Sequence, residues 1–357
     1  MKPLSAHATI YVPGGSLGSI PTAHISWCGE CHPTATFNGT FVLVPRSNAT
    51  KVATIGTDRR KSIADNKEKA EGEYVMQVTQ SGALRSPMFH LSDLNVFLND
   101  GVLVHRWRLR EQYIQMLLDQ VSTLADHTES VALEVDGKTP RAFHGGFEQN
   151  VVLNNLTRLD ILLGPVQQIL RDDVYIYQFK VNLKAAFVGD LWPWHQDYSF
   201  WAKEDQMPAP RAVTVGIFLD DVTEFNGPIY FIPASHRSGC HDAAQLQSDA
   251  PNDDNWLRHV GASLSYRTDP RKVAHLAASY GMVAPKGRRG TILFFDCNVV
   301  HASPANISPI PRRIIFITYN SLHNVPGNER RPAFLVNRNV SPLEPLDGHD
   351  LVELVTG

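Results

Sequence analysis

Cysteine is scarce in this chain, which has four cysteines among 357 residues. That number is too small for the disulfide framework of a small secreted domain, so a reducing compartment is the simpler expectation. Two of the four, Cys28 and Cys31, precede His32 in a C-x-x-C-H pattern, the form of a c-type haem attachment site. A zinc site would need two further ligands, and no second C-x-x-C or H-x-x-x-H occurs in the sequence. We therefore interpret this pattern as a chance match in a loop.

Long apolar runs and an excess of basic charge are also missing. No run approaches the roughly 18 residues that a membrane-spanning helix needs, and the N-terminus shows no apolar core followed by a cleavage site. The 33 basic and 36 acidic side chains give a net charge of −3, whereas nucleic-acid binders usually carry a basic face. The composition, 43% hydrophobic and 19% charged, is that of a globular protein. We expect a cytoplasmic enzyme or small-molecule binder with neither a nucleic-acid nor a membrane partner.

Residues 1–90 differ in character from the rest of the chain. Two strands are predicted there, Ala8–Val12 and Thr40–Val44, separated by segments rich in glycine, proline and serine. The polar, charge-dense stretch Asp58–Glu73 is typical of a solvated loop or a short helix. We expect residues 1–90 to form an N-terminal extension packed on the core, and residues 91–357 to form the main domain.

The main domain begins with helical patterns. Ser92 or Asp93 can cap a short helix that stops before Gly101. Apolar residues recur at helical spacing within Trp107–Leu124, and Leu159–Leu170 is a further predicted helix. Short strands follow these helices, predicted over Val174–Leu183, Ala212–Leu219, Pro228–Pro233, Thr291–Phe295 and Ile314–Tyr319. Because no strand–helix–strand alternation occurs, we expect an antiparallel barrel or a double-sheet jelly roll flanked by helices.

The segment Trp192–Trp201 carries the first candidates for a metal site. In an extended segment, residues two apart point to the same side, so His195 and Asp197 can direct an imidazole and a carboxylate at one point. His301, just after an apolar strand, can supply a third ligand. Two histidines and one carboxylate are the facial triad of non-haem Fe(II) oxygenases, which leaves coordination positions open for a co-substrate and oxygen. The chain has 15 histidines, so a hydrogen-bonded structural role for each of these two is the alternative.

An arginine eleven residues after His301 strengthens this interpretation. Arg312 opens the predicted strand that ends at Tyr319. An arginine there can hold one end of a dicarboxylate in a two-point hydrogen-bonded fork, which lysine could not do as well. The alternative is that Arg312 and Arg313 are surface charges at the start of a strand.

From about residue 91 to 340 the sequence resembles the phytanoyl-CoA dioxygenase family of Fe(II)/2-oxoglutarate oxygenases, particularly its ectoine hydroxylase branch. Many short motifs match in the same order and spacing, which is far more specific than three ligands alone. They are Asp173-Val-Tyr-Ile-Tyr-Gln178, Trp194-His-Gln-Asp-Tyr198, Glu204-Asp-Gln-Met-Pro208, Asn226-Gly-Pro228, His301-Ala-Ser303 and Tyr319-Asn320. The resemblance implies a mainly β fold with a double-stranded β-helix (jelly-roll, cupin-like) core in residues 91–357, and a hydroxylase that uses Fe(II), 2-oxoglutarate and O2.

The resemblance also implies roles for single residues. His195, Asp197 and His301 match the iron ligands, and Arg312 matches the arginine that pairs with the far carboxylate of 2-oxoglutarate. Further matches are implied to line the pocket. Those near the co-substrate are Gln178, Ser303 and Trp201, and those near the substrate are Tyr198, Trp201, Phe295, Phe316 and Arg331. Among the latter, Arg331 resembles an arginine that holds a substrate carboxylate. Asp197 favours hydroxylation over halogenation, because related halogenases replace this carboxylate with Ala or Gly.

Some positions depart from the ectoine hydroxylase pattern. Tyr198 stands where that branch has Phe, Ser199-Phe200 replaces an acidic–polar pair, and Lys180 stands where Arg is usual. These changes fall near the pocket, so we expect a small carboxylate-bearing substrate, such as an amino acid or a specialised-metabolism intermediate, and leave its identity open. Two other functions are consistent with the three ligands: a zinc hydrolase and a jelly-roll metal-binding protein without catalysis. The oligomeric state is open as well, a homodimer being one candidate.

Overall fold

The computed structural model describes residues 89–126, 128–241, 264, 266–328 and 330–346, and the backbone of short strands at 5–8, 23–26, 243–245 and 355–356. The chain divides into two compact units, Met1–Ser86 and Pro87–Gly357. In the first unit, strands β1 (Ser5–Ala8) and β2 (Ala23–Ser26) pair antiparallel. Of the predicted strand at 8–12 only Ala8 is described, and the predicted strand at 40–44, the polar stretch at 58–73 and the C-x-x-C-H pattern lie outside the described residues.

The first helices of the second unit alternate with strands that the sequence pattern did not predict, and mainly strands follow them. Its first half contains α1 (Leu91–Asp100), β3 (Val102–Leu109), α2 (Glu111–Thr123), β4 (Val131–Leu133), β5 (Pro140–His144), α3 (Val151–Thr157), α4 (Asp160–Leu170), β6 (Val174–Lys184), β7 (Trp192–His195) and α5 (Asp197–Glu204). Its second half contains β8 (Ala212–Phe218), β9 (Tyr230–Phe231), β10 (Ala243–Gln245), β11 (Tyr266–Thr268), α6 (Pro270–Tyr280), β12 (Thr291–Asp296), β13 (His301–Ser303), β14 (Arg312–Ser321) and β15 (Val355–Thr356).

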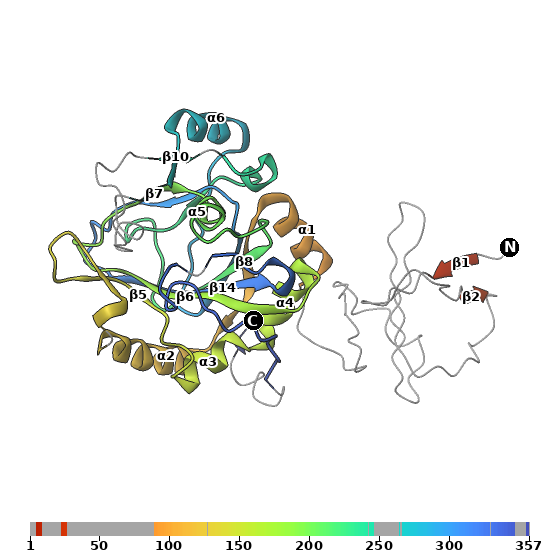
Figure 1. Ribbon diagram of the computed structural model, residues 1–357, viewed down its shortest axis with the longest axis horizontal. Helices are drawn as coiled ribbons and strands as arrows, with labels where there is room; N and C mark the ends of the chain where they lie inside the picture. Colours follow the sequence, from red (N-terminus) through yellow and green to blue (C-terminus); the bar gives the residue numbers. More distant parts are fainter. Residues whose placement is uncertain are drawn as a thin grey trace. The chain divides into compact units, whose positions relative to one another are not determined.

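Two antiparallel sheets form the core of this unit. The large sheet has the strand order β15-β3-β12-β8-β14-β6-β5-β4, and the small sheet has the order β7-β13-β9. Neighbours in these sheets are mostly distant in sequence, and the two sheets lie one above the other in Figure 1. The architecture is the expected double-stranded β-helix with flanking helices. Within the described residues, no helix is long and apolar enough to cross a membrane.

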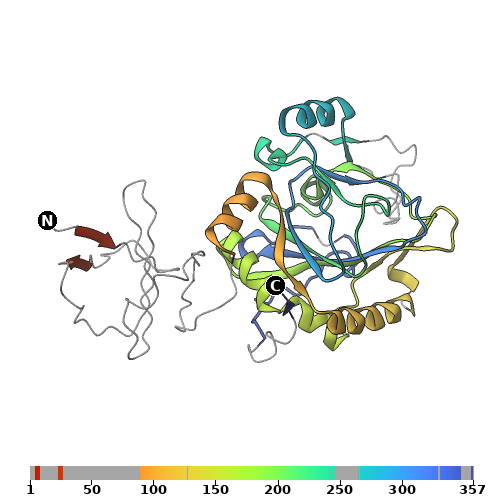
Figure 2. The same cartoon turned by 180° about the vertical axis from the view of Figure 1, so that it is seen from behind.

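Helices α2, α3 and α4 cover one face of the large sheet, and Figure 2 shows the same layer from behind. The apolar residues of α2 that recur at helical spacing, Ile114, Leu117 and Val121, are buried in the largest core cluster. The same cluster takes Phe179 and Val181 from β6, so this face of β6 points toward the helices. The opposite face of the large sheet is therefore the one that looks toward the small sheet and can line a pocket.

Most predicted elements are confirmed, and two are wrong in part. The helix predicted over Trp107–Leu124 begins only at Glu111, because residues up to Leu109 belong to β3 and pair with β12. Gly101 adopts the left-handed conformation at the C-cap of α1 and turns the chain directly into β3. Pairing with β12 then decides the conformation of 102–109, where local periodicity carries little information. The strand predicted at 228–233 shrinks to the two residues of β9, flanked by prolines that lack an N–H to donate.

A β-bulge in β6 sets which of its side chains face the small sheet. The pairing of β6 with β14 shifts register at Thr318/Tyr319, so Tyr177 is left without a partner between Ile176 and Gln178. Beyond the bulge, alternate residues starting from Gln178 face the pocket, whereas Ile176 and Phe179 lie in the core cluster under the helices. As a result, Tyr177 and Gln178 both lie away from the helical layer.

Candidate active site

The three predicted metal ligands come together at the edge of the small sheet. His195, the last residue of β7, and His301, the first residue of β13, are cross-strand partners, and their ring centroids are 4.2 Å apart. Asp197 is the first residue of α5, and its Oδ1 lies 3.7 Å from His195 Nε2. One ligand atom from each residue lies within 4.8 Å of the others. The prediction that His195 and Asp197 share an extended segment is wrong, because the chain enters α5 after Gln196, yet the two side chains still converge.

Backbone carbonyls orient both imidazoles. His195 Nδ1 lies 2.6 Å from the carbonyl oxygen of Pro193, and His301 Nδ1 lies 3.0 Å from that of Val299. If each Nδ1 donates its proton to the carbonyl, each Nε2 is an acceptor that faces the site, as in most histidine metal ligands. Burial, together with the neighbouring His195, lowers the pKa of His301 to about 3, so the imidazole is neutral at neutral pH.

Asp197 completes a donor set that suits iron. Burial by itself would raise the pKa of this carboxyl, but the nearby Lys180 ammonium opposes this effect, and the pKa lies below its usual range. Its Oδ2 is buried and has no hydrogen-bond partner among the described residues. Two imidazoles and one ionised carboxylate with a free oxygen are the ligands of a non-haem Fe(II) centre, so the residues present fit this metal.

A single pocket opens beside these ligands and collects most of the other predicted residues. Its walls include Gln178, Trp201, Phe295, Ser303, Arg312, Phe316 and Arg331. Tyr198 is the exception among the predicted site residues, because it does not line the pocket and its hydroxyl lies 3.3 Å from the carbonyl oxygen of Pro208. Phe200, two residues further along α5, lines the pocket instead.

Arg312 lies at the inner end of the pocket. Its side chain is buried at the start of β14, and one terminal nitrogen donates to Ser303 Oγ at 3.3 Å. Within the described part of the chain, its Nε and other terminal nitrogen have no hydrogen-bond partner. Burial lowers the pKa of this guanidinium to about 9, which still leaves it charged at neutral pH. A buried cation with two unused donors is suited to a carboxylate.

Two pocket residues, His144 from β5 and Asn182 from β6, were not predicted from the sequence. Lys180 from β6, expected near the pocket as a departure from the ectoine hydroxylase pattern, and Trp192 from β7 also line it. Phe316, Lys180 and His144 are successive register partners, so they form one row across β14, β6 and β5. The alternation of polar and apolar residues over 178–184 was the available signal, since the polar residues occupy one face of an otherwise apolar strand.

The pocket arginine Arg331 is held by a buried acid. Its Nε donates to Asp205 Oδ1 at 2.7 Å, its terminal nitrogen donates to Asp205 Oδ2, and the Tyr177 hydroxyl donates to the same oxygen. The guanidinium also stacks on the Phe200 ring, 4.6 Å from its centroid. Asp205 is fully buried, so the charge of Arg331 is balanced inside the protein.

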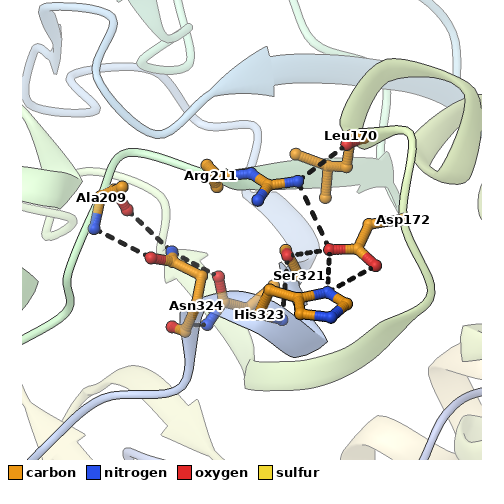
Figure 3. Close-up of polar contacts among 8 residues, drawn as sticks. Leu170, Asp172, Ala209, Arg211, Ser321, His323 and Asn324 are labelled. Carbon is orange, nitrogen blue, oxygen red and sulfur yellow. Dashed lines mark hydrogen bonds and ion pairs between the residues drawn. The ribbon is translucent and has the colours of Figure 1, made fainter. Parts of the chain in front are cut away.

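A polar network fixes the loop at Ala209 and Arg211 (Figure 3), which follows Asp205 in the chain. Asn324 accepts a hydrogen bond from the Ala209 backbone N–H at 2.9 Å and donates to its carbonyl at 2.7 Å. Asp172, at the junction of α4 and β6, accepts from the hydroxyl of Ser321 and lies 2.9 Å from His323 Nδ1. The same carboxylate lies 3.4 Å from Arg211 at the end of the loop. These contacts tie the loop to the end of β14.

Comparisons with known proteins agree with this site. The family model of phytanoyl-CoA dioxygenase matches residues 97–314. The chain is 38% identical over 254 residues to the L-proline trans-4-hydroxylase of Streptomyces griseoviridis, covering 71% of this chain and 94% of that protein. It is 34% identical over 245 residues to the ectoine dioxygenase of Sphingopyxis alaskensis, covering 67% and 78%.

A solved structure shares the fold as well. The crystal structure of EctD from S. alaskensis with 2-oxoglutarate and 5-hydroxyectoine aligns with a TM-score of 0.62 and 28% identity, covering 79% of this chain and 97% of that chain. Another structure of that protein contains bound iron and aligns with the same TM-score over 73% of this chain and 88% of that chain. The chain belongs to the phytanoyl-CoA dioxygenase family of non-haem Fe(II)- and 2-oxoglutarate-dependent oxygenases.

Proposed function

We propose that residues 91–357 hydroxylate an aliphatic C–H bond of a small amino acid, with L-proline as the first substrate to test. The observation that carries the proposal is the shared pocket, in which the His195, Asp197 and His301 ligands face the unused donors of Arg312. The relative named as an L-proline trans-4-hydroxylase supports the choice of substrate class. Ectoine is the comparison substrate, because other relatives are ectoine dioxygenases.

The inner half of the pocket is suited to the co-substrate. Arg312 would hold the far carboxylate of 2-oxoglutarate through its two unused donors, with Ser303 fixing the guanidinium. Gln178 is positioned by its hydrogen bond to the Leu335 carbonyl at 2.7 Å and would line the same half. Bound Fe(II) would supply, with 2-oxoglutarate and O2, the oxidising power that converts a C–H bond to an alcohol while the co-substrate becomes succinate and CO2.

The outer half is suited to an amino acid carboxylate. The Lys180 ammonium lies 5.6 Å from the centroid of the Phe316 ring, and no described acidic residue lies within ion-pair distance of it, although its charge acts on Asp197. Because Asp205 balances Arg331 in a two-point ion pair, Lys180 is the less compensated cation of this half. We place the substrate carboxylate between Lys180 and Arg331, with its aliphatic carbons against Phe295 and Phe316, and Trp201 between substrate and co-substrate.

Two steps test the proposal. Metal-free protein receives Fe(II) and then 2-oxoglutarate without oxygen, and the visible charge-transfer band of the chelated co-substrate is measured. We expect a band that is lost in His195→Ala and weakened in Arg312→Ala. Oxygen is then admitted with L-proline or ectoine, and succinate and the hydroxylated product are quantified.

The outcomes separate the alternative functions. A zinc hydrolase would give no band and would not need 2-oxoglutarate. A binding protein without catalysis would take up the metal but release no succinate above background with either substrate. Hydroxylation of ectoine but not of L-proline would support the oxygenase activity but overturn L-proline as the substrate.

A further inference from the structure

Four side-chain atoms at the Arg312 end of the pocket have no hydrogen-bond partner among the described residues although they are buried. Three are donors, namely Nε and one terminal nitrogen of Arg312 and Nε1 of Trp192. One is an acceptor, the Oδ1 of Asn182. Buried polar groups are nearly always paired, so an unpaired cluster that lines a cavity points to a ligand. The excess of donors over acceptors indicates an anionic ligand with several oxygens.

The strand pairing places Trp192 beside the predicted carboxylate site. Trp192 is the first residue of β7, and its cross-strand partner is Ser303 of β13. Ser303 in turn accepts the hydrogen bond of Arg312 at 3.3 Å. The indole therefore belongs to the same end of the pocket as the two unused donors of Arg312.

The ring of Trp192 is held rigidly. The Arg141 guanidinium lies 4.1 Å from the ring centroid, and Ala132 and Ala142 pack in the same small apolar cluster. Arg141 is itself fixed, because it donates to buried Glu134 at 2.8 Å and to the Leu191 carbonyl at 2.7 Å. A preorganised donor of this kind does not have to be ordered when the ligand binds.

The electrostatic surroundings also favour an anion. Lys184 is buried and donates to the carbonyls of Asp190 and Pro304. Burial, together with the nearby guanidiniums of Arg312 and Arg141, lowers the pKa of Lys184 to about 6. Burial is the main cause of this shift, and the two guanidiniums add a smaller contribution of positive potential, which a carboxylate would relieve.

We propose that Trp192 is a further co-substrate-binding residue, whose indole N–H donates to the far carboxylate of 2-oxoglutarate beside Arg312. The inference rests on the proposed function. Trp192 would then favour 2-oxo acids that end in a carboxylate over those that end in an apolar group, because the indole N–H can only donate a hydrogen bond and an apolar group cannot accept one. The residue acts on binding and does not take part in the oxidation.

The test compares two co-substrates in the full chain loaded with Fe(II) and kept without oxygen. 2-Oxoglutarate is titrated against 2-oxobutanoate, which lacks the far carboxylate, and the Kd is measured from the charge-transfer band. Trp192→Phe keeps the stacked ring but removes the donor. We expect this variant to weaken 2-oxoglutarate binding by roughly 10- to 100-fold, as expected for losing a hydrogen bond to a charged group, and to leave 2-oxobutanoate binding unchanged. Trp107→Phe on β3, outside the pocket, is the matched control.

Each outcome decides the inference. An unchanged Kd for 2-oxoglutarate in Trp192→Phe overturns it, and so does an equal loss for both acids, which would indicate a distorted pocket. Absence of the band in the wild-type chain overturns the proposed function instead, so the two failures are distinguishable.

A second measurement on the wild-type chain avoids dependence on the variant's folding. With Zn(II) in place of Fe(II) and nitrogen-15 in the indoles, one N–H resonance should shift downfield with 2-oxoglutarate but not with 2-oxobutanoate. If no indole signal distinguishes the two acids, the proposed contact is contradicted.

Discussion

Arg331 and Asp205 form a two-point ion pair at the wall of the pocket, although they are 126 residues apart in the sequence. The carboxylate is fully buried and the guanidinium stacks on Phe200 at the pocket surface. The pair gives Arg331 a fixed direction while cancelling its charge, so the arginine can orient a ligand without supplying net attraction.

Replacing Asp205 with Asn should destabilise the protein strongly. The substitution leaves the Arg331 cation buried without its counter-charge, which costs about 3–5 kcal/mol in comparable buried pairs. Urea denaturation of both proteins measures the change in the free energy of unfolding. The double variant Asp205→Asn with Arg331→Met should recover part of the loss, because it removes the unpaired charge as well. A single variant as stable as the wild type would contradict the role of the pair.

Replacing Lys180 with Met should weaken substrate binding while sparing the co-substrate. Lys180 is the cation of the outer half that has no ion-pair partner among the described residues, so the KM for a carboxylate substrate should rise at least roughly 10-fold. Lys180→Arg keeps the charge and should stay closer to the wild type. Lys286→Met, which removes an exposed ammonium paired with Glu224 outside the pocket, is the matched control. If the KM rises only in Arg331→Met, the substrate carboxylate is held by the arginine and our placement is wrong.

Metal binding should stabilise the wild-type chain against heat. At a free metal concentration of 100 times the Kd, linkage predicts about 2.7 kcal/mol of stabilisation. Asp197→Ala removes the carboxylate of the three-residue ligand set found among the described residues, so the increase in Tm on adding Fe(II) without oxygen should largely disappear. Asp119→Ala on α2 alters an exposed carboxylate and should keep the full increase. A full metal-dependent increase in Asp197→Ala would remove this residue from the ligand set.

Asp172 should make stability depend on acid pH. Burial alone would raise the pKa of this carboxyl, but the hydrogen bonds of Ser321 and His323 outweigh it and lower the pKa. The ordinary value for Asp is about 3.9, so its contribution to stability is complete above that pH and is lost as the pH falls through the lower pKa of the folded protein. Acid denaturation followed by circular dichroism measures the loss.

Asp172→Asn should lower the free energy of unfolding at pH 7 by roughly 1–3 kcal/mol. Below the ordinary pKa of an aspartate, the stability of this variant should change less with pH than that of the wild type. Asp93→Asn breaks an exposed pair with Arg106 and should cost less than roughly 1 kcal/mol. Equal effects of the two substitutions would show that the network in Figure 3 adds no more than a surface ion pair.

Local sequence patterns were enough to predict much of the fold. The apolar spacing of Ile114, Leu117 and Val121 predicted the buried face of α2, and the segments around β6, β8, β12 and β14 were recognisable as strands. They were recognisable because side-chain burial repeats with the period of the element itself. The boundary of β3 was not recognisable, since its conformation depends on pairing with β12, which is remote in sequence.

The candidate ligands and Arg312 could be predicted because each lies in a short motif and because its type of side chain by itself indicates metal or carboxylate binding. His195 and Asp197 are two residues apart, and Arg312 follows His301 by eleven residues. What the motifs could not contain is which face of β6 points into the pocket. The bulge at Tyr177 directs Gln178, Lys180 and Asn182 inward, and it arises from the register between β6 and β14.

The sequence by itself therefore determined the types of chemical group available and the periodicity that buries one face of each element. Only the tertiary structure decided their charge balance. Whether Arg331 is a free cation depends on Asp205, and whether Trp192 has a partner depends on the pairing of β7 with β13. Electrostatic and hydrogen-bonding interactions act through space over a few ångströms, so residues far apart in the chain set the properties of the site.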